Sequence, residues 1–529
     1  MIIISVAGLL ACNSGSSEQG VGGSLAAGGK ATGGSTATGG VASGGVIGSG
    51  GATSGGVSGS GGATSGGSGS GGPRTGGATG SGGSASGSLP ATGGSAGSTP
   101  GGAGGKGSGG DGGSDGSAGA MGGAKMGDAG NGGVVGSGGS AGGASGGGTA
   151  TGGTGEACGY PENTGACCDV TAGGLKKNAN LPDPFAMHDG KRISAKADWA
   201  CRRNEIKKDI EKYEIGTKPE PPTVAATYAS NKLSVTVTTT SGSITLTSTV
   251  SGSGSCVVIG MNGTSSLVSG CTQVPFMHDQ VVGYNSGGGT QNQSDPFYKL
   301  YPSLFGKIGN YNAWSWGISR LIDGIVQVKD QMKVDPTKIA VHGCSYAGKM
   351  ALFGGAFDER VALTVAQESG GGGITSWRTS QDFSTRTKVN VEKIDNTNYA
   401  WFMSSMKSLD PYSLPHDHHE LVAMVAPRAI IALGNPGYEW LGDESGYKSV
   451  LAAVQVFTAM GVADHIGYDF TGGHSHCAAA SSQQASVKTF VDKYLKDGTG
   501  ASNVAIKPSA SNYELDYTKV IDWTTPTLQ

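Results

Sequence analysis

The stretch VHGCSYAGK, residues 341–349, decides how this chain folds. It continues an apolar run, KIAVH (338–342), and leads into AGKMALFGGAF (347–357), which has the composition of a helix. A serine between a buried strand and a helix is typical of a nucleophile elbow, the sharp turn that raises a serine above a sheet. Two details depart from the usual G-x-S-x-G pattern: the closing glycine, Gly348, comes one residue late, and a cysteine adjoins Ser345. The alternative is a serine that only caps a helix.

Short apolar runs alternate with helical stretches over most of the second half of the chain. Four such runs predict buried strands, at residues 256–260, 338–342, 362–366 and 429–433. Helical patterns lie between them, for instance at 317–334. This alternation predicts a parallel sheet covered on both faces. We therefore expect an α/β protein with the α/β-hydrolase fold, a three-layer sandwich around a mostly parallel central sheet.

Two other patterns precede these strands. Residues 197–216 predict an amphipathic helix that stops at a glycine, with the apolar or aromatic positions Trp199, Ile206, Ile210 and Tyr213. Residues 232–240 and 243–250 alternate with a period of two and are rich in β-branched residues, which predicts antiparallel strands.

Composition divides the chain into three parts. Residues 1–12 form a short apolar stretch ending in LLAC, which resembles a lipoprotein signal whose Cys12 is acylated after cleavage; the basic start of an export signal is missing, and a chance apolar start is the alternative. Residues 13–156 hold most of the 101 glycines and predict a disordered Gly/Ser/Ala/Thr-rich linker. Residues 157–529 have ordinary composition and predict a single catalytic domain.

Charge and hydropathy limit the partners. The net charge of −3 argues against nucleic acid as a partner. No apolar run reaches the roughly 20 residues of a membrane helix. We expect an exported monomer, either secreted or held at the envelope or surface of a bacterium, with Cys12 as its only membrane attachment.

A serine nucleophile needs a base, and the candidate histidines near the C-terminus are His465, His474 and His476. The last two lie in the glycine-rich segment GGHSHC (472–477), ahead of the final helical stretch. Cys477 adjoins His476 as Cys344 adjoins the serine, so a disulfide between them would hold the nucleophile loop against the base loop. The competing interpretation of HSHC is a zinc site.

The other cysteines of the last three quarters of the chain suggest further disulfides whose pairing the sequence leaves open: Cys158, Cys167, Cys168, Cys201, Cys256 and Cys271. A histidine-dense stretch, HDHH (416–419), precedes a helix and a buried strand. We interpret it as structural, with metal binding or catalysis as the alternative.

Two carboxylates compete to orient the base. Glu368 follows the strand after the nucleophile, and Asp443 follows the next strand. Either could hold the imidazole and stabilise its charged form.

The chain resembles the glucuronoyl esterases, carbohydrate esterase family 15, over nearly all of its folded part. Several motifs carry this resemblance: LPDPF (181–185), DWACRR (198–203), GCSYAGK (343–349), QESGGGG (367–373) followed by Trp377-Arg378, DHHELVAMVAPRA (417–429), NPGYEWL (435–441) and GGHSHC (472–477).

The resemblance implies roles for individual residues. Ser345 corresponds to the nucleophile, His476 to the general base and acid, and Glu368 to the usual acid. In some bacterial members an acid after the later strand shares or takes over the role, which keeps Asp443 as an alternative. The family also implies the disulfide between Cys344 and Cys477.

The substrate-binding residues follow from the same resemblance. Lys349 matches a lysine that binds sugar hydroxyls, and Trp440 matches an aromatic contact to the sugar. The family's further polar sugar contacts have no clear match, but Glu392 and Asn398 lie nearby in the sequence, and we take Glu392 as a candidate.

One position departs from the family. Members carry an arginine directly after the serine, where it contributes charge to the oxyanion hole, whereas this chain has Tyr346. The backbone N–H of Tyr346 can still hold an oxyanion, but its phenol lacks the charge and the forked donors of a guanidinium.

The resemblance implies an esterase that needs no metal or cofactor. Its expected substrate is the ester between (4-O-methyl-)glucuronic acid of glucuronoxylan and lignin alcohols, cleaved through a glucuronoyl-enzyme intermediate. Two alternatives remain open: an esterase for another carbohydrate or aryl ester, such as an acetyl xylan esterase, and a non-catalytic glycan-binding surface protein.

Overall fold

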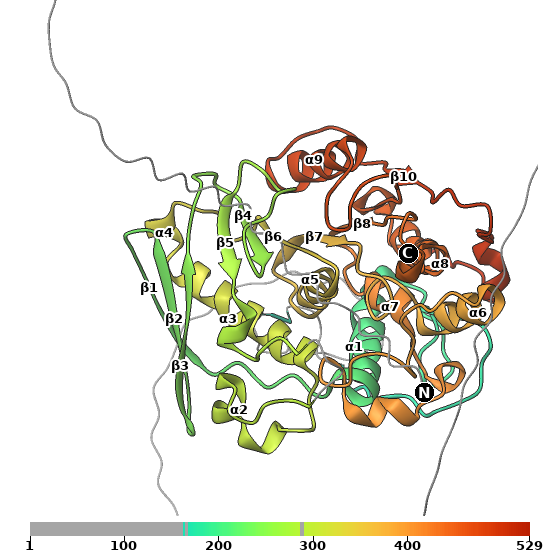
Figure 1. Cartoon of the computed structure of the whole chain (residues 1–529), viewed down its shortest axis with the longest axis horizontal. Helices are drawn as coiled ribbons and strands as arrows, with labels where there is room; N and C mark the ends of the chain where they lie inside the picture. Colours follow the sequence, from blue (N-terminus) through green and yellow to red (C-terminus); the bar gives the residue numbers. More distant parts are fainter. Residues whose placement is uncertain (1–161, 164–167, 286–289) are drawn as a thin grey trace, which may run out of the picture. The chain divides into compact units, whose positions relative to one another are not determined.

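A seven-stranded parallel sheet is the centre of the described structure (Figure 1). The structure is a computed structural model that describes residues 162–163, 168–285 and 290–529. The predicted signal segment with Cys12, the predicted linker, Cys158 and Cys167 lie outside these residues. The strand order is β10-β9-β8-β7-β6-β4-β5, and every neighbouring pair is parallel. The predicted mostly parallel sheet is confirmed.

The four predicted buried strands lie within two residues of observed strands, whereas the helical stretch predicted at 317–334 is two helices, the first of which begins earlier, at Asn310. The strands are β1 (Thr223–Ala229), β2 (Lys232–Thr239), β3 (Gly242–Thr249), β4 (Val257–Met261), β5 (Thr272–Phe276), β6 (Ile339–Cys344), β7 (Val361–Gln367), β8 (Ala429–Leu433), β9 (Ile466–Asp469) and β10 (Ala505–Ile506). The helices are α1 (Trp199–Ile210), α2 (Pro296–Leu300), α3 (Asn310–Gln327), α4 (Lys329–Met332), α5 (Tyr346–Phe357), α6 (Trp377–Thr387), α7 (His418–Ala423), α8 (Asp443–Ala459) and α9 (Ser481–Leu495).

Helices cover both faces of the sheet, as the apolar runs predicted. Figure 1 shows α9 on one side of the strands and α3, α5 and α7 on the other. Val258 and Ala340 belong to the apolar cluster that includes the α9 residue Phe490, whereas Val257 and Val341 belong to the cluster of α5. Successive side chains of one strand therefore enter opposite layers, because side chains alternate across a strand. None of the helices in the described residues has the length and apolar character needed to cross a bilayer.

A separate antiparallel sheet, β1-β2-β3, packs beside α3. Its register sets Val235 opposite Leu246, so the alternating apolar side chains gather on one face. The two strands predicted from period-two alternation are confirmed. The sequence did not identify β1, whose residues alternate between exposed and half-buried positions.

The predicted amphipathic helix at 197–216 is present. The helix α1 continues into a π-helical turn, Glu211–Ile215, and its predicted apolar residues are buried. Lys208 and Lys212 on the opposite face are exposed. Arg202, three residues after Trp199, lies on the buried face, where it pairs with Glu205 at 2.7 Å and with Glu420 at 2.6 Å.

The HDHH stretch forms a buried hydrogen-bond cluster around Glu214. Its carboxylate lies 2.7 Å from His416 Nε2 and 2.9 Å from His418 Nε2, and it accepts a 2.8 Å bond from Trp377 Nε1. His418 Nδ1 lies 2.6 Å from the carbonyl oxygen of Gly373. These contacts join the end of α1 to the starts of α6 and α7, which supports the structural interpretation of HDHH.

The Glu214 cluster makes stability depend on pH. Burial lowers the pKa of His418, but the Glu214 carboxylate outweighs it and the net pKa is raised above 6.5. Burial likewise opposes ionisation of Glu214, yet the two histidines hold its pKa well below its usual range. His418 contributes its full share to the free energy of unfolding below its unfolded pKa, and this share is lost as pH rises through its folded pKa. Glu214 contributes its full share above its unfolded pKa, and that share is lost in acid.

We expect Glu214→Gln to lower the free energy of unfolding by about 3 kcal/mol near pH 5.5, because it removes the charge partner of a buried imidazolium. The difference from the unmodified chain should shrink above the folded pKa of His418. Urea unfolding across this pH range measures both effects, with the exposed Glu220→Gln as the matched control. A loss that does not depend on pH would contradict the charge pairing.

Candidate functional site

Ser345 sits in a strained turn between β6 and α5. Its backbone φ of 60° and ψ of −127° are unusual for a residue with a side chain. Strain of this kind costs about 1–3 kcal/mol and is found mainly at functional sites. The Ser345 hydroxyl makes no capping hydrogen bond to α5, so the capping alternative is wrong. The strand–turn–helix context is that of a nucleophile elbow.

Two glycines around the serine allow β6, β7 and α5 to come close together. A Cβ atom on Gly343 would lie 2.2 Å from the carbonyl oxygen of Ala347, and one on Gly348 would lie 2.4 Å from that of Gln367. Gly348 therefore meets β7 rather than the turn itself. This close approach accounts for the glycine that comes one residue late in the motif.

Glu368 orients the imidazole of His476. Nδ1 of His476 lies 2.7 Å from Oε2 of Glu368, and the backbone N–H of Cys477 donates to Oε1 at 3.2 Å. Glu368 directly follows β7 and is only 1% exposed. With its Nδ1 proton directed at this carboxylate, the ring keeps Nε2 available as an acceptor.

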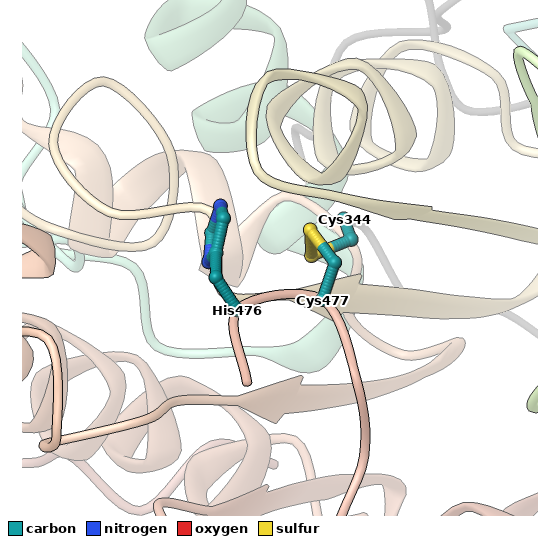
Figure 2. Close-up of side chains that lie close together, drawn as sticks. All are labelled: Cys344, His476 and Cys477. Atoms are coloured by element: carbon teal, nitrogen blue, oxygen red, sulfur yellow. A yellow bond between two sulfur atoms is a disulfide. The ribbon is translucent and has the colours of Figure 1, made fainter. Parts of the chain in front are cut away.

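A disulfide joins the loop of the base to the strand that ends at the nucleophile. Cys344 and Cys477 are bonded with their Cα atoms 5.6 Å apart, although 133 residues separate them in the sequence (Figure 2). This is the pairing expected from the sequence. In the described part of the chain Ser345 Oγ makes no hydrogen bond to His476, and such catalytic contacts often tighten only when substrate binds.

The other histidines of the C-terminal region do not take the place of His476. Nδ1 of His474 lies 3.9 Å from Oε1 of Glu368, but its Nε2 lies 2.8 Å from the carbonyl oxygen of Thr471. His465 Nδ1 lies 2.5 Å from the carbonyl oxygen of Pro427. Cys344, His476 and Cys477 do bring possible metal-binding atoms within 4.8 Å of one another. Both sulfurs are used in the disulfide, however, so neither is a thiolate and the zinc interpretation of HSHC does not fit.

Asp443 lies near enough to Glu368 for their charges to interact, but it does not contact His476. It is the first residue of α8 and is 2% exposed, and its Oδ2 has no hydrogen-bond partner among the described residues. Burial raises the pKa of Asp443 to about 7, and the charge of Glu368 adds to this effect. The geometry thus favours Glu368 over Asp443 as the partner of the base.

A cavity of about 390 Å³ opens beside Ser345. Its wall includes all three predicted substrate-binding residues, Lys349, Glu392 and Trp440. The other wall residues are Tyr284, Tyr346, Glu368, Ser369, Gly370, Gly371, Asn390, Val391, Asn396, Thr397, Asn398, Trp401 and Leu441.

One end of the cavity is polar. Lys349 and Glu392 form an ion pair, and the hydroxyl of Thr397 donates to the same carboxylate at 2.7 Å. The Lys349 ammonium also lies 5.6 Å from the centre of the Trp401 ring. This end offers charged donors and acceptors at fixed positions.

Aromatic side chains form the rest of the wall. Trp440 is 47% exposed, and its ring centre lies 4.9 Å from that of His476. The ring of Tyr346, the residue after the serine, lies 4.4 Å from that of Tyr284 and 5.9 Å from that of Trp401. Tyr284 and Trp401 were missed because lone aromatic residues in irregular segments carry no periodic signal.

Comparisons with known proteins point to one family. A family model described as glucuronyl esterase of fungi matches residues 224–461. A 4-O-methyl-glucuronoyl methylesterase of Podospora anserina is 34% identical over 386 residues, which cover 70% of this chain and 79% of the relative.

Two solved structures are similar over their whole length. The glucuronoyl esterase catalytic domain from Hypocrea jecorina has a TM-score of 0.61 and 35% identity, covering 67% of this chain and 98% of that chain. A serine-to-alanine variant of the glucuronoyl esterase from Sporotrichum thermophile, in complex with methyl 4-O-methyl-β-D-glucopyranuronate, has a TM-score of 0.63 and 32% identity, covering 69% and 100%.

We expect the double replacement Cys344→Ala with Cys477→Ala to lower the free energy of unfolding by about 2–4 kcal/mol, because it frees a long loop in the unfolded chain. Denaturant unfolding measures the loss. The matched control is the pair Cys256→Ala with Cys271→Ala, which opens a disulfide between residues only 15 apart and should cost less. An equal loss in the two variants would contradict the loop-length explanation.

Proposed function

Because this chain belongs to the glucuronoyl esterase family, carbohydrate esterase family 15, we propose that it cleaves the ester between (4-O-methyl-)glucuronic acid of glucuronoxylan and lignin alcohols. It is a carboxylic ester hydrolase, as the family's name states. The observation that supports its activity best is the Glu368–His476 pair, tied through the disulfide to the residue before Ser345.

The first half of the reaction forms an ester on the serine. His476 Nε2 removes the hydroxyl proton of Ser345 as Oγ attacks the carbonyl carbon, and the Glu368 carboxylate stabilises the imidazolium that results. The N–H of Tyr346 lies in the first turn of α5, where it lacks an intrahelical acceptor. This N–H helps to hold the oxyanion of the tetrahedral intermediate.

The second half releases the sugar acid. The intermediate collapses as the bond to the alcohol oxygen breaks, and His476 gives its proton to that oxygen. A water molecule then attacks the glucuronoyl ester on Ser345, with His476 as base again. The bond to Oγ breaks, the serine recovers its proton from the imidazolium, and the uronic acid leaves.

The polar end of the cavity suits the sugar. The ion-paired Lys349 and Glu392 provide a donor and an acceptor that can bind adjacent hydroxyl groups in one orientation. Trp440, largely exposed beside His476, offers an apolar face to a sugar ring. A glucuronoyl group placed here would bring its carboxyl carbon to Ser345.

The disulfides support export. The described residues contain three, Cys168–Cys201, Cys256–Cys271 and Cys344–Cys477, and disulfides persist mainly in oxidising compartments. We propose that the enzyme acts outside the cytoplasm, as a monomer, on plant cell-wall polymers, anchored through Cys12 or secreted.

Tyr346 favours a second candidate within the serine esterases. The phenol of Tyr346 lacks the charge and the forked donors of the arginine that the family carries beside the nucleophile, so the side-chain contact to the ester differs from the family's. An esterase for acetylated xylan or aryl esters is therefore the alternative substrate class. A non-catalytic glycan-binding protein fits less well, because the strained serine and the buried acid–base pair are both retained.

We expect the full chain to hydrolyse benzyl glucuronate and its 4-O-methyl form, and Ser345→Ala to lower kcat by at least about 10⁴-fold with the fold unchanged. The test measures the release of the product acid by both proteins, and circular dichroism compares their folds. Serine-dependent cleavage of acetylated xylan alone would instead support the second candidate. Turnover that survives the substitution would contradict the role of Ser345.

The identity of the acid is tested by amide replacements of both carboxylates. Glu368→Gln should lower kcat by about 10⁴-fold, because the amide no longer stabilises the imidazolium or its tautomer. Asp443→Asn should change kcat by less than about three-fold, because its carboxyl does not touch the base. The reverse order of effects would transfer the role to Asp443.

A further inference from the structure

The hydroxyl of Tyr346 is held by two side chains from the loops after β4 and β5. It lies 3.1 Å from Nδ2 of Asn262 and 3.1 Å from Nε2 of His278. Nδ1 of His278 lies 2.9 Å from a carboxylate oxygen of Asp279 but makes no hydrogen bond among the described residues. These contacts hold the residue that directly follows the nucleophile, and no proposed catalytic step uses them.

The two contacts fix the phenolic oxygen of Tyr346. Burial lowers the pKa of His278, so its ring is neutral at neutral pH. The phenolic oxygen accepts from the Asn262 amide and shares a second hydrogen bond with Nε2 of His278. Because two side chains hold this oxygen, the orientation of the Tyr346 ring is fixed, and the ring lines the cavity.

The clamped ring is part of an aromatic wall of three mutually adjacent rings. The wall consists of Trp401, Tyr346 and Tyr284; the ring centre of Tyr346 lies 5.9 Å from that of Trp401 and 4.4 Å from that of Tyr284, and the last two lie 5.6 Å apart. Trp401 lies beside the ammonium of Lys349, and Tyr284 is 44% exposed. The wall thus joins the polar end of the cavity to an exposed aromatic ring.

The two parts of an ester divide between these ends. Resting on the proposed function, the sugar acid occupies the polar end at Lys349 and Glu392. The leaving oxygen must lie within reach of Ser345 and His476, and the rest of the alcohol continues from there away from the polar end. Tyr284 is the exposed aromatic surface that an aryl group would remove from water at that position.

We propose that Tyr346, clamped by His278 and Asn262, and Tyr284 are specificity-determining residues that bind the alcohol part of the ester and favour aromatic over small aliphatic alcohols. In this chain the residue after the nucleophile acts through its ring, while its hydroxyl fixes the orientation of that ring.

The test separates alcohol binding from turnover. The full chain carrying Ser345→Ala binds benzyl glucuronate and methyl glucuronate, which share the acid and differ in the alcohol, and calorimetry gives both Kd values. Adding Tyr284→Ser should reduce the preference for the benzyl ester about five-fold. Tyr284→Phe, which keeps the ring, is the matched control and should retain the preference.

A second variant addresses the clamped residue itself. Tyr346→Arg in the same Ser345→Ala background replaces the clamped ring of Tyr346 by a charged side chain. This variant should also reduce the preference for the benzyl ester. An unchanged preference in the Tyr284→Ser variant overturns the proposal. So does a preference that falls only with Trp440→Ser, since the alcohol would then lie against Trp440.

Failure of the proposed function gives a different result. Hydrolysis of the two esters by the chain with Ser345 intact reports the function, whereas the ratio of Kd values reports the aromatic wall. If neither ester binds, the alcohol site is refuted. If the esters bind with the expected ratio but are not cleaved, the wall stands and the reaction assignment fails.

Discussion

The covalent bond between Cys344 and Cys477 is the constraint on which the site depends. A strained serine turn is useful only if a base is held within reach of it, and here the base comes from a loop far along the chain. The disulfide holds the residue next to each of them in a fixed relation. The Glu368 carboxylate completes the arrangement, since it binds both the His476 ring and the N–H of Cys477. The segments that carry Ser345, Glu368 and His476 thus come together although, in the described part of the chain, the Ser345 hydroxyl makes no hydrogen bond to His476.

A cluster of buried charged and polar side chains around Glu214 also stabilises this arrangement. Glu214 gathers two histidines and Trp377, and His418 reaches the carbonyl of Gly373 in the loop that follows the acid. The same loop contributes Ser369, Gly370 and Gly371 to the cavity wall. The polar residues of α1 and α7 therefore act on the site through the backbone, without facing substrate.

Two histidines near Ser345 have different roles. Glu368 orients His476, whose free nitrogen serves the serine. His278, together with Asn262, holds the phenol of Tyr346, and the result is a fixed aromatic ring rather than a proton acceptor. The difference lies in what each histidine faces: a hydroxyl at a strained turn in the first case, and a half-buried tyrosine whose pKa is raised by burial in the second.

The sequence by itself determined the elements with strong local signals. Short apolar runs predicted β4, β6, β7 and β8, and the glycines and serine after β6 predicted the elbow, because burial and close backbone approach each restrict residue type. The short strands β5, β9 and β10 and the exposed strand β1 carry weak patterns and were missed.

Only the tertiary structure decided between Glu368 and Asp443, between a disulfide and a zinc site, and between a free and a clamped hydroxyl on Tyr346. Each choice depends on distances between residues far apart in the chain, which no local pattern records.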